Sequence, residues 1–390
     1  MKSIVNWLRR VADITPDGGL AVRLFQVLVP GFEPLDIANW LISVDPQGAL
    51  PSNIHASGPE SLSMIRLPDL PGREANIHEC HQLGSDLASL FSLALNVRVI
   101  IPHAFNINVP QLNRLIFQPF SQIIDRSILR PVPNDPKQRI ETYLIKIAGL
   151  AEEDLSTISA ACSVYHASLL LFDREARVAY TLLVAGIEIL SRKYGAPPTD
   201  WTEWEESDSW DNFIATQDYT SFQAAAIRER LMRDRQLRLG ATFCNYAAYR
   251  LSDDFWEKPW EEWIYGINAN EGTWLPANPM DARIVSDILP KDRAGLQKAL
   301  GKSYGLRSSI VHAGDWVELL GLSPPPVPAL DLNRPLPFAI LRAILAELIW
   351  QEISTHTKSC CLPDFQLLRS SHNASAQPIN PADAKNRAAD

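Results

Sequence analysis

The stretch Tyr180-Thr-Leu-Leu-Val-Ala-Gly-Ile-Glu-Ile-Leu190 belongs to the most apolar helix that the sequence predicts, from Arg174 to Tyr194, which Gly195 ends. A helix that is apolar on most sides is buried by its neighbours, so we place this one at the centre of the fold. Glu188 interrupts its apolar C-terminal half. Because a lone buried carboxylate is unfavourable, Glu188 either faces a site or pairs with a cation such as Arg307.

Further helices are predicted on both sides of this one. Apolar residues at helical spacing mark a helix over 137–149, which leads into the central group. We expect the C-terminal half to be an antiparallel α-helical bundle. Its helices are expected near 152–171, 174–194, 221–251, 291–312 and 338–355.

The first 135 residues show a different pattern. Runs rich in β-branched residues are bounded by Pro and Gly, and one apolar stripe repeats at helical spacing. The runs predict strands over 20–29, 63–67 and 97–101, and the stripe predicts a helix over 82–96. The fold class is therefore α+β, with an N-terminal mixed α/β module over 1–135, which we interpret as a sensor, and a helical domain over 136–356.

The candidate chemistry lies in Leu306-Arg-Ser-Ser-Ile-Val-His-Ala-Gly314. The guanidinium of Arg307 can hold a phosphate through paired hydrogen bonds. The imidazole of His312 can move protons near neutral pH. Together they could cleave RNA without a metal ion, with His312 handling the proton of the 2′-hydroxyl or of the leaving group and Arg307 stabilising the charge on the phosphate.

Geometry limits this hypothesis. On an ideal helix the two side chains lie about 140° apart around the axis and about 7.5 Å apart along it. They converge on one phosphate only if the helix breaks nearby or if a second copy supplies the partner. The alternative is a buried His312 together with an Arg307 that pairs with an acidic neighbour, and the spacing alone does not decide between the two.

Four pieces in chain order resemble the Apea-like branch of HEPN domains. That branch has a helix ending in an apolar-Glu-apolar patch, a long Arg-rich helix, an Arg-Ser-x-x-x-His-x-Gly segment and a closing helix. The matching pieces here are Tyr180 to Leu190, Ala226 to Leu251, Leu306 to Gly314, and Leu341 to Glu347. The resemblance covers residues 150–356, which is about half of the chain.

The resemblance implies a HEPN-like helical domain with metal-independent endoribonuclease activity, and many relatives act in antiviral or abortive-infection defence. HEPN enzymes generally work as homodimers that bring two copies of the motif together. His312 would be the acid and base, Arg307 the phosphate clamp and Glu188 an orienting or pairing group. Ser308 stands where many relatives carry a polar amide or a histidine, although its hydroxyl can still donate to a phosphate. The alternatives are a non-catalytic scaffold or ligand-sensing adaptor, and a nucleic-acid binder that does not cleave.

A run of arginines is the candidate contact for the RNA backbone. The segment from Arg228 to Arg238 has five arginines and two acids, a local charge of +3 on a chain whose net charge is −9. A solvated helix face with internal ion pairs is the alternative. The candidate residues are Arg228, Arg230, Arg233, Arg235 and Arg238.

Two segments combine tryptophans with acids, near 196–220 and 253–290, and we interpret them as insertions in the helical domain. Acidic residues do not suit a phosphate backbone, which requires cations. We therefore expect these segments to pack their own indoles onto the core rather than to form a partner surface. The indoles in question are those of Trp201, Trp204, Trp210, Trp256, Trp260 and Trp263.

Composition sets the remaining expectations. The five cysteines form no Cys-x-x-Cys pair, which favours reduced thiols and a cytoplasmic protein. No apolar run approaches the ~20 residues of a membrane span, and the first residues lack the apolar core of a signal peptide. Residues 357–390 have the composition of a disordered tail. The partners expected are thus RNA, a second copy, and an unknown trigger on the N-terminal module, with no membrane.

Two motifs invite a metal or a nucleotide and are rejected. His78-Glu-Cys-His81, with His55 and His103 as further candidates, lacks the paired ligand spacing of a zinc site. Gly301-Lys302-Ser303 lacks the spacing and the preceding strand of a phosphate-binding loop. We therefore expect no metal ion and no cofactor.

Overall fold

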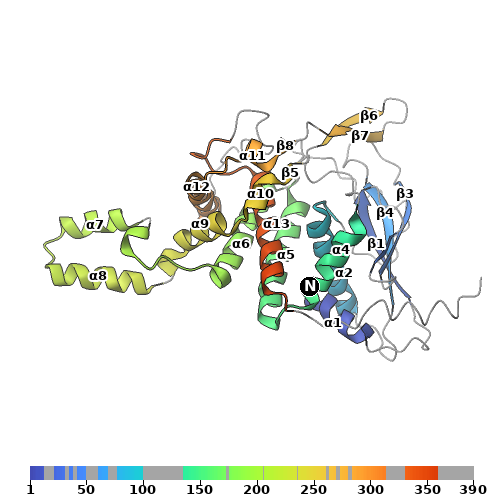
Figure 1. The fold of residues 1–390 in the computed structure, drawn as a ribbon, viewed down its shortest axis with the longest axis horizontal. Helices are drawn as coiled ribbons and strands as arrows, with labels where there is room; N and C mark the ends of the chain where they lie inside the picture. The colour runs from blue at the N-terminus through green and yellow to red at the C-terminus, as the bar shows by residue number, and fades with distance from the viewer. Residues whose placement is uncertain are drawn as a thin grey trace, which may run out of the picture.

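The computed structural model describes residues 1–12, 22–30, 35–37, 42–49, 60–68, 77–99, 135–172, 175–204, 206–234, 236–260, 263–268, 273–279, 283–312 and 330–358. Over these residues the protein is α-rich (Figure 1). Packed helices form its body, a four-stranded sheet lies at one end, and the helices α7 and α8 extend from the other end (Figure 1).

Among the described residues of the first hundred positions, two helices enclose four strands in sequence. The structure confirms the strands predicted over 20–29 and 63–67 and the helix predicted over 82–96, with ends shifted by a few residues. The elements are α1 (Lys2–Ala12), β1 (Val22–Pro30), β2 (Leu35–Ile37), β3 (Ile42–Ala49), β4 (Glu60–Pro68) and α2 (Ile77–Leu95).

The sheet is antiparallel, with the strand order β1-β4-β3-β2. β1 and β4 pair without a break, from Val22 opposite Pro68 to Pro30 opposite Glu60. The pairing of β3 with β4 shifts in register between Pro46 and Ala49. Pro46 has no backbone N–H to give to the ladder, which accounts for an irregularity at this position.

The strand predicted over 97–101 is wrong for residues 97–99, which are not part of any sheet. Asn96, with φ of 54°, ends α2 in the left-handed region. The backbone N–H of Val99 then donates to the Ser92 hydroxyl, and its carbonyl accepts from Nε2 of His166. The side chains of Ser92 and His166 thus satisfy the backbone groups of Val99 that a neighbouring strand would have bound. Residues 100 and 101 lie outside the described part of the chain.

The rest of the chain is mainly helical, and the helices predicted over 137–149, 152–171, 174–194, 291–312 and 338–355 are confirmed within a few residues. The elements are α4 (Pro136–Ala148), α5 (Glu152–Leu171), α6 (Ala176–Tyr194), η1 (Trp201–Glu203), α7 (Ser207–Thr216), α8 (Ser221–Arg233), η2 (Gln236–Arg238), α9 (Leu239–Arg250), α10 (Asp253–Glu257), β5 (Pro259–Trp260), β6 (Trp263–Asn268), β7 (Thr273–Pro279), β8 (Arg283–Ile284), α11 (Val285–Ile288), α12 (Arg293–His312) and α13 (Phe338–His356). β5 pairs with β8 and β6 with β7, both antiparallel.

The helix α6 lies at the centre of this body, as its apolar sequence predicts. It packs against α5, α9, α12 and α13. Leu183, Val184 and Ile187 are completely buried. A Cβ atom added at Gly186 would lie 2.6 Å from Cδ2 of Leu345, so α6 and α13 approach each other more closely than an alanine there would permit.

One hydrophobic core joins α1 and α2 to the helices that follow residue 135. α2 packs on α4 and α5, and Phe91 is completely buried among them. The domain boundary expected near residue 135 stays a prediction. Residues of α1 and α2 share one hydrophobic core with the later helices.

The single long helix predicted over 221–251 is wrong, because it breaks into α8, η2 and α9. α8 has no buried residue, whereas seven residues of α9 are buried. Between them Arg238 is buried and its guanidinium donates to the carbonyl of Pro198. This tertiary contact directs the chain from the projecting α8 into the core, which local helix propensity does not anticipate.

Candidate functional site

The motif residues lie on the last two turns of α12. The first half of this helix is anchored in the core, where Leu296, Ala299 and Leu300 are completely buried. Ser303 continues the anchor, since its hydroxyl donates to the carbonyl of Ala299 and accepts from the N–H of Leu336. After Ser303, none of residues 304–312 is buried, so the helix leaves the core where the motif begins.

Glu188 and Arg307 are brought together, as the sequence suggested. Nη2 of Arg307 lies 3.9 Å from Oε2 of Glu188, which is 8% exposed. Arg192, one turn after Glu188 on α6, donates to Oε1 from Nη2 at 2.5 Å and from Nε at 3.1 Å. The buried carboxylate therefore lies between two guanidinium groups. Arg192 is not among the residues predicted for the site, although a Glu followed four residues later by an Arg is a recognised helical pair.

Tyr304 belongs to the same group and was also missed. Its ring centroid lies 5.1 Å from that of Phe243 on α9. Burial, and then the negative charge of Glu188, raise the pKa of Tyr304, while Arg307 and Arg192 oppose them. The phenol therefore keeps its proton at neutral pH, and Tyr304 lies one turn before Arg307 on α12. Its spacing of three residues from Arg307 was the available signal.

His312 and Ser308 are not gathered with this group in one chain. His312 is exposed at the last position of α12, and Ser308 is half-buried. Because the helix is continuous from Arg307 to His312, the two side chains leave it on different sides, as calculated for an ideal helix. The expected alternative of a buried histidine is wrong for His312. Ala313 and Gly314 lie outside the described residues.

The five arginines proposed for RNA contact have different environments. Arg230 is exposed, and the structure gives it no ion pair within the described residues. Arg233 is exposed and pairs with Glu229 at 2.5 Å, a contact of the kind that contributes little in solvent. Arg238 is buried against Pro198 and is withdrawn from the candidate set. Arg235 lies outside the described residues.

Arg228 is tied into the Trp-rich segment. Its Nε donates to Asp211 at 2.8 Å, and its guanidinium lies over the ring of Trp201, 5.6 Å from the centroid. Nε1 of Trp201 donates to the other oxygen of Asp211. The indoles of Trp204, Trp256 and Trp260 are buried, which confirms for these three the expectation that such segments pack onto the core.

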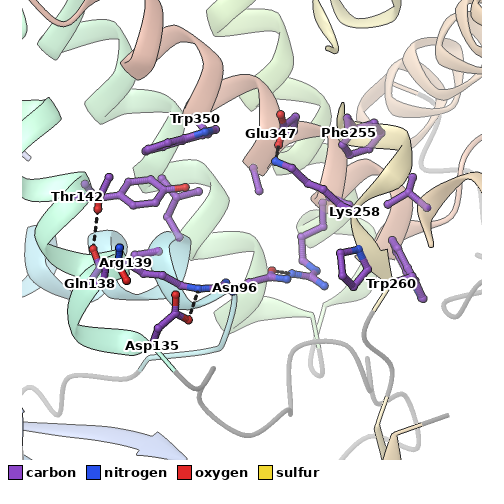
Figure 2. A pocket seen from close by; sticks show the side chains of 18 residues that line it. Asn96, Asp135, Gln138, Arg139, Thr142, Phe255, Lys258, Trp260, Glu347 and Trp350 are labelled. Atoms are coloured by element: carbon purple, nitrogen blue, oxygen red, sulfur yellow. Dashed lines mark hydrogen bonds and ion pairs between the residues drawn. The ribbon is translucent and has the colours of Figure 1, made fainter. Parts of the chain in front are cut away.

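A pocket of ≈530 Å³ lies elsewhere on the helical body, between the end of α2, α4, α13 and the α10–β5 segment (Figure 2). Trp350 and the residues of α4 form one side, while Phe255, Lys258 and Trp260 form the other (Figure 2). Nζ of Lys258 lies 2.5 Å from Oε2 of Glu347. No sequence pattern marks this pocket, because its lining comes from segments that are far apart in the chain.

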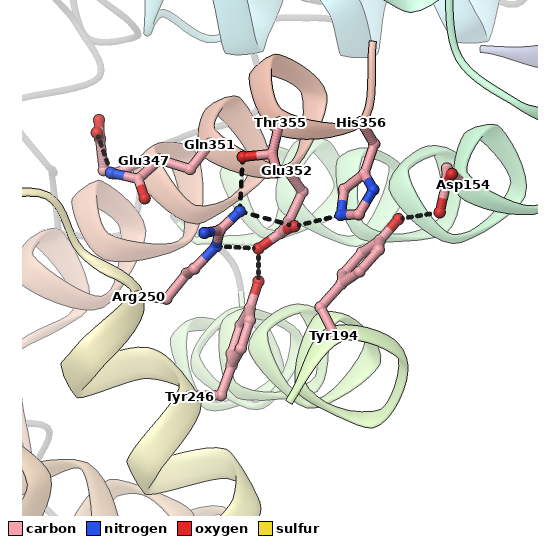
Figure 3. Close-up of polar contacts among 9 residues, drawn as sticks. All are labelled: Asp154, Tyr194, Tyr246, Arg250, Glu347, Gln351, Glu352, Thr355 and His356. Atoms are coloured by element: carbon pink, nitrogen blue, oxygen red, sulfur yellow. Dashed lines mark hydrogen bonds and ion pairs between the residues drawn. The ribbon is translucent and has the colours of Figure 1, made fainter. Parts of the chain in front are cut away.

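A buried carboxylate also joins α9 to α13 (Figure 3). The side chain of Glu352 is completely buried and binds Arg250 through distances of 2.6 and 3.2 Å. The Tyr246 hydroxyl donates to Oε1 at 2.8 Å, and Nε2 of His356 lies 3.1 Å from Oε2. Burial, and then the charge of Glu352, raise the pKa of Tyr246. Both carboxylate oxygens of Glu352 have hydrogen-bond partners, so we interpret this network as structural.

The side chains of His78 and His81 lie outside the described part, so the structure does not describe the rejected metal motif. None of the described helices combines the length and the apolar character needed to cross a membrane. Comparisons of the chain with protein family models, with curated proteins and with solved structures found no match.

Proposed function

We propose that this protein is a metal-independent endoribonuclease of HEPN type whose site is the end of α12. The observation that carries the proposal is the contact of Arg307 with the buried Glu188, on a helix whose last residue is the exposed His312. Nη2 of this guanidinium lies within ion-pair distance of Glu188. The side chain of Arg307 is 30% exposed, so it can still present donors to a phosphate.

The reaction is an internal transfer at phosphorus. The 2′-oxygen of the substrate bonds to phosphorus as the bond to the 5′-oxygen breaks, which yields a 2′,3′-cyclic phosphate and a free 5′-hydroxyl. His312 removes the proton of the 2′-hydroxyl or gives a proton to the departing oxygen. Arg307 stabilises the charge that develops on the phosphoryl oxygens. Ser308 lies next to Arg307 in sequence and can donate a further hydrogen bond from its hydroxyl.

The helical geometry favours a site that is shared with a second copy. Arg307 and His312 of one chain diverge, so we propose a homodimer in which Arg307 of one protomer and His312 of the other act on the same phosphate. Arg230 and Arg233 on the projecting α8 supply contacts to the RNA backbone, and Arg228, which is bound to Asp211, lies on the same helix. A role in antiviral or abortive-infection defence is part of this proposal and rests on the resemblance alone.

The test is cleavage of pooled cellular RNA in EDTA by the wild-type protein and by the His312→Ala and Arg307→Ala variants. Both variants should lose cleavage, while Val311→Ala and Lys298→Ala, which alter exposed positions on the same helix, should retain it. Cleavage that EDTA abolishes would contradict the proposal, as would cleavage that survives His312→Ala. RNA that is bound in a salt-dependent manner but left intact would indicate a nucleic-acid binder.

A second candidate function is a non-catalytic, ligand-sensing adaptor. The pocket beside Lys258 favours it, because a cavity of ≈530 Å³ has the size of a small-molecule site. If the protein is only an adaptor, His312→Ala should behave as wild type in every RNA assay.

A further inference from the structure

The pocket of Figure 2 has the dimensions of a ligand site and walls from elements that are distant in sequence. Its volume of ≈530 Å³ lies within the range of small-molecule pockets. The walls come from the end of α2, from α4, from the α10–β5 segment with α11, and from α13. A bound molecule would therefore contact segments that are distant in sequence.

Aromatic side chains line two sides of this pocket. Trp350 and Tyr143 lie on one side, with ring centroids 4.6 Å apart. Phe255 and Trp260 lie on the other (Figure 2). Burial, and then the charge of Glu347, raise the pKa of Tyr143, so its phenol stays protonated. Opposed aromatic walls favour a flat ligand, since rings pack against each other in offset or edge-to-face arrangements.

The charge of the lining favours an anion. Among the described lining residues, three cations (Arg139, Lys258 and Arg342) outnumber two carboxylates (Asp135 and Glu347), and Arg139 pairs with Asp135 at 3.0 Å. Arg342 is 2% exposed, and its guanidinium donates to Asn96 and lies 3.4 Å from the Tyr165 hydroxyl, so a positive charge is fixed at the pocket floor. A positive charge in a low-dielectric wall attracts anions more strongly than one on the open surface.

The carboxylate of Glu347 is already engaged. It binds Lys258 through Oε2 at 2.5 Å and accepts from Nε2 of Gln351 through Oε1 at 3.0 Å. A cationic ligand would have to displace these partners. Lys258 has two further N–H donors and a side chain that is 44% exposed, so it can bind an anion while it remains paired with Glu347.

One buried donor in the wall has no acceptor. The residue Trp260 is 7% exposed, and its Nε1 has no hydrogen-bond partner within the described part of the chain. Buried indole N–H groups usually donate to something. The buried indoles of Trp204 and Trp256, which do not line this pocket, also lack a partner among the described residues, so this donor alone does not mark a ligand.

We propose that this pocket binds a planar aromatic molecule that carries one anionic group. The ring packs between the aromatic walls, while Lys258 donates to the anion and the positive charge of Arg342 attracts it. This site is separate from the end of α12, and its function does not depend on RNA cleavage. It supplies a place for the small-molecule signal that a sensing protein requires.

The test uses three probes that share one ring and differ in charge. Indole-3-acetate is an anion, indole-3-acetamide is its neutral counterpart, and tryptamine is a cation. Binding to the full-length protein is followed by calorimetry and by the shift of the melting temperature. Indole-3-acetate should bind with a dissociation constant in the millimolar range or tighter, about tenfold more tightly than the acetamide, and tryptamine should not bind. Phenyl phosphate, tested in parallel, distinguishes a preference for phosphate from one for carboxylate.

Variants then locate the binding. Lys258→Met should weaken indole-3-acetate about tenfold and Trp260→Phe several-fold, while Lys298→Met, an exposed cation on α12, should have no effect. Glu347→Gln should strengthen binding several-fold, because it removes a negative charge and releases Lys258. An increase in affinity cannot arise from misfolding, because misfolding would weaken binding. Failure of both anionic probes to bind would overturn the proposal, as would equal binding of tryptamine or an affinity that Lys258→Met and Glu347→Gln leave unchanged.

Discussion

The guanidinium of Arg307 on α12 lies 3.9 Å from the buried carboxylate of Glu188 on α6, and the same carboxylate binds Arg192 at 2.5 Å. If Glu188 positions Arg307 for a phosphate, Glu188→Gln should lower kcat for RNA cleavage about tenfold and leave KM nearly unchanged. Arg192→Gln is the control, since it removes the neighbouring cation and leaves Arg307 in place. Both rates are measured under saturating RNA, and equal losses in the two variants would show that Glu188 has only a structural role.

The composite site makes a sharper prediction in mixtures of variants. Arg307→Ala and His312→Ala should each be inactive alone, but a mixed dimer contains one site in which both residues are intact. After the two variants are mixed in equal amounts and allowed to exchange subunits, about a quarter of the wild-type activity should return. Light scattering confirms the dimer. No recovery in exchanged dimers would show that the two residues act within one chain, or not at all.

Much of the helical body could be predicted, because most of its helices have apolar residues at helical spacing in their own sequence. The apolar stripe of α6 and its end at Gly195 were readable from local sequence, and Glu188 stood out because it interrupts that stripe. The break between α8 and α9 was not readable, since it depends on Arg238 reaching Pro198 across 40 residues. The strand predicted after Asn96 failed for a related reason, because Ser92 and His166 satisfy the backbone of Val99.

The candidate site was predicted only in part, for the same physical reason. A motif names Arg307 and His312, but the environment that gives each side chain its role comes from other helices. Arg192 pairs with Glu188 within α6, and Tyr304 lies one turn before Arg307 within α12. These two pairs come together only after α6 and α12 have packed. The pocket beside Lys258 has no sequence signature at all, because no two of its walls are adjacent in the chain.

The buried Glu352 predicts a stability effect that differs from that of a surface pair. Arg250→Met leaves a completely buried carboxylate with Tyr246 and His356 as partners, and should lower the free energy of unfolding by about 1–3 kcal/mol. Arg334→Ala removes an exposed pair with Asp331 and should change it by less than about 0.5 kcal/mol. Urea unfolding measures both. Equal effects would show that the network contributes no more than a surface contact.

His166 predicts the acid dependence of stability. Burial lowers the pKa of its imidazole, and the hydrogen bond from Nε2 to the Val99 carbonyl opposes this shift. The folded state thus binds the proton less tightly than the unfolded state, whose pKa is about 6.5. The contribution of the neutral His166 imidazole to the stability of the protein is fully present above about pH 6.5. It is lost as the pH falls below this value.

His166→Gln keeps a donor for Val99 and cannot titrate, so its stability should fall less steeply than that of the wild type as the pH decreases from 7 towards 5. His312→Gln alters an exposed histidine and should keep the slope of the wild type. Chemical unfolding across this range supplies the slopes. Parallel curves for His166→Gln and the wild type would contradict the role assigned to burial.

Two helical glycines predict opposite effects of the same substitution. A Cβ atom at Gly186 would lie 2.6 Å from Cδ2 of Leu345 and 3.1 Å from Cγ2 of Val164, so Gly186→Ala must displace side chains between α6, α13 and α5. It should lower the free energy of unfolding by about 1–3 kcal/mol. A Cβ atom at Gly305 on α12 has nothing within 4 Å among the described residues. Gly305→Ala should therefore raise that free energy by about 0.5–1 kcal/mol, because alanine loses less backbone entropy in a helix. Denaturation of both variants tests the packing at the centre of the fold, and a stabilising Gly186→Ala would show that α6 and α13 lie further apart than described.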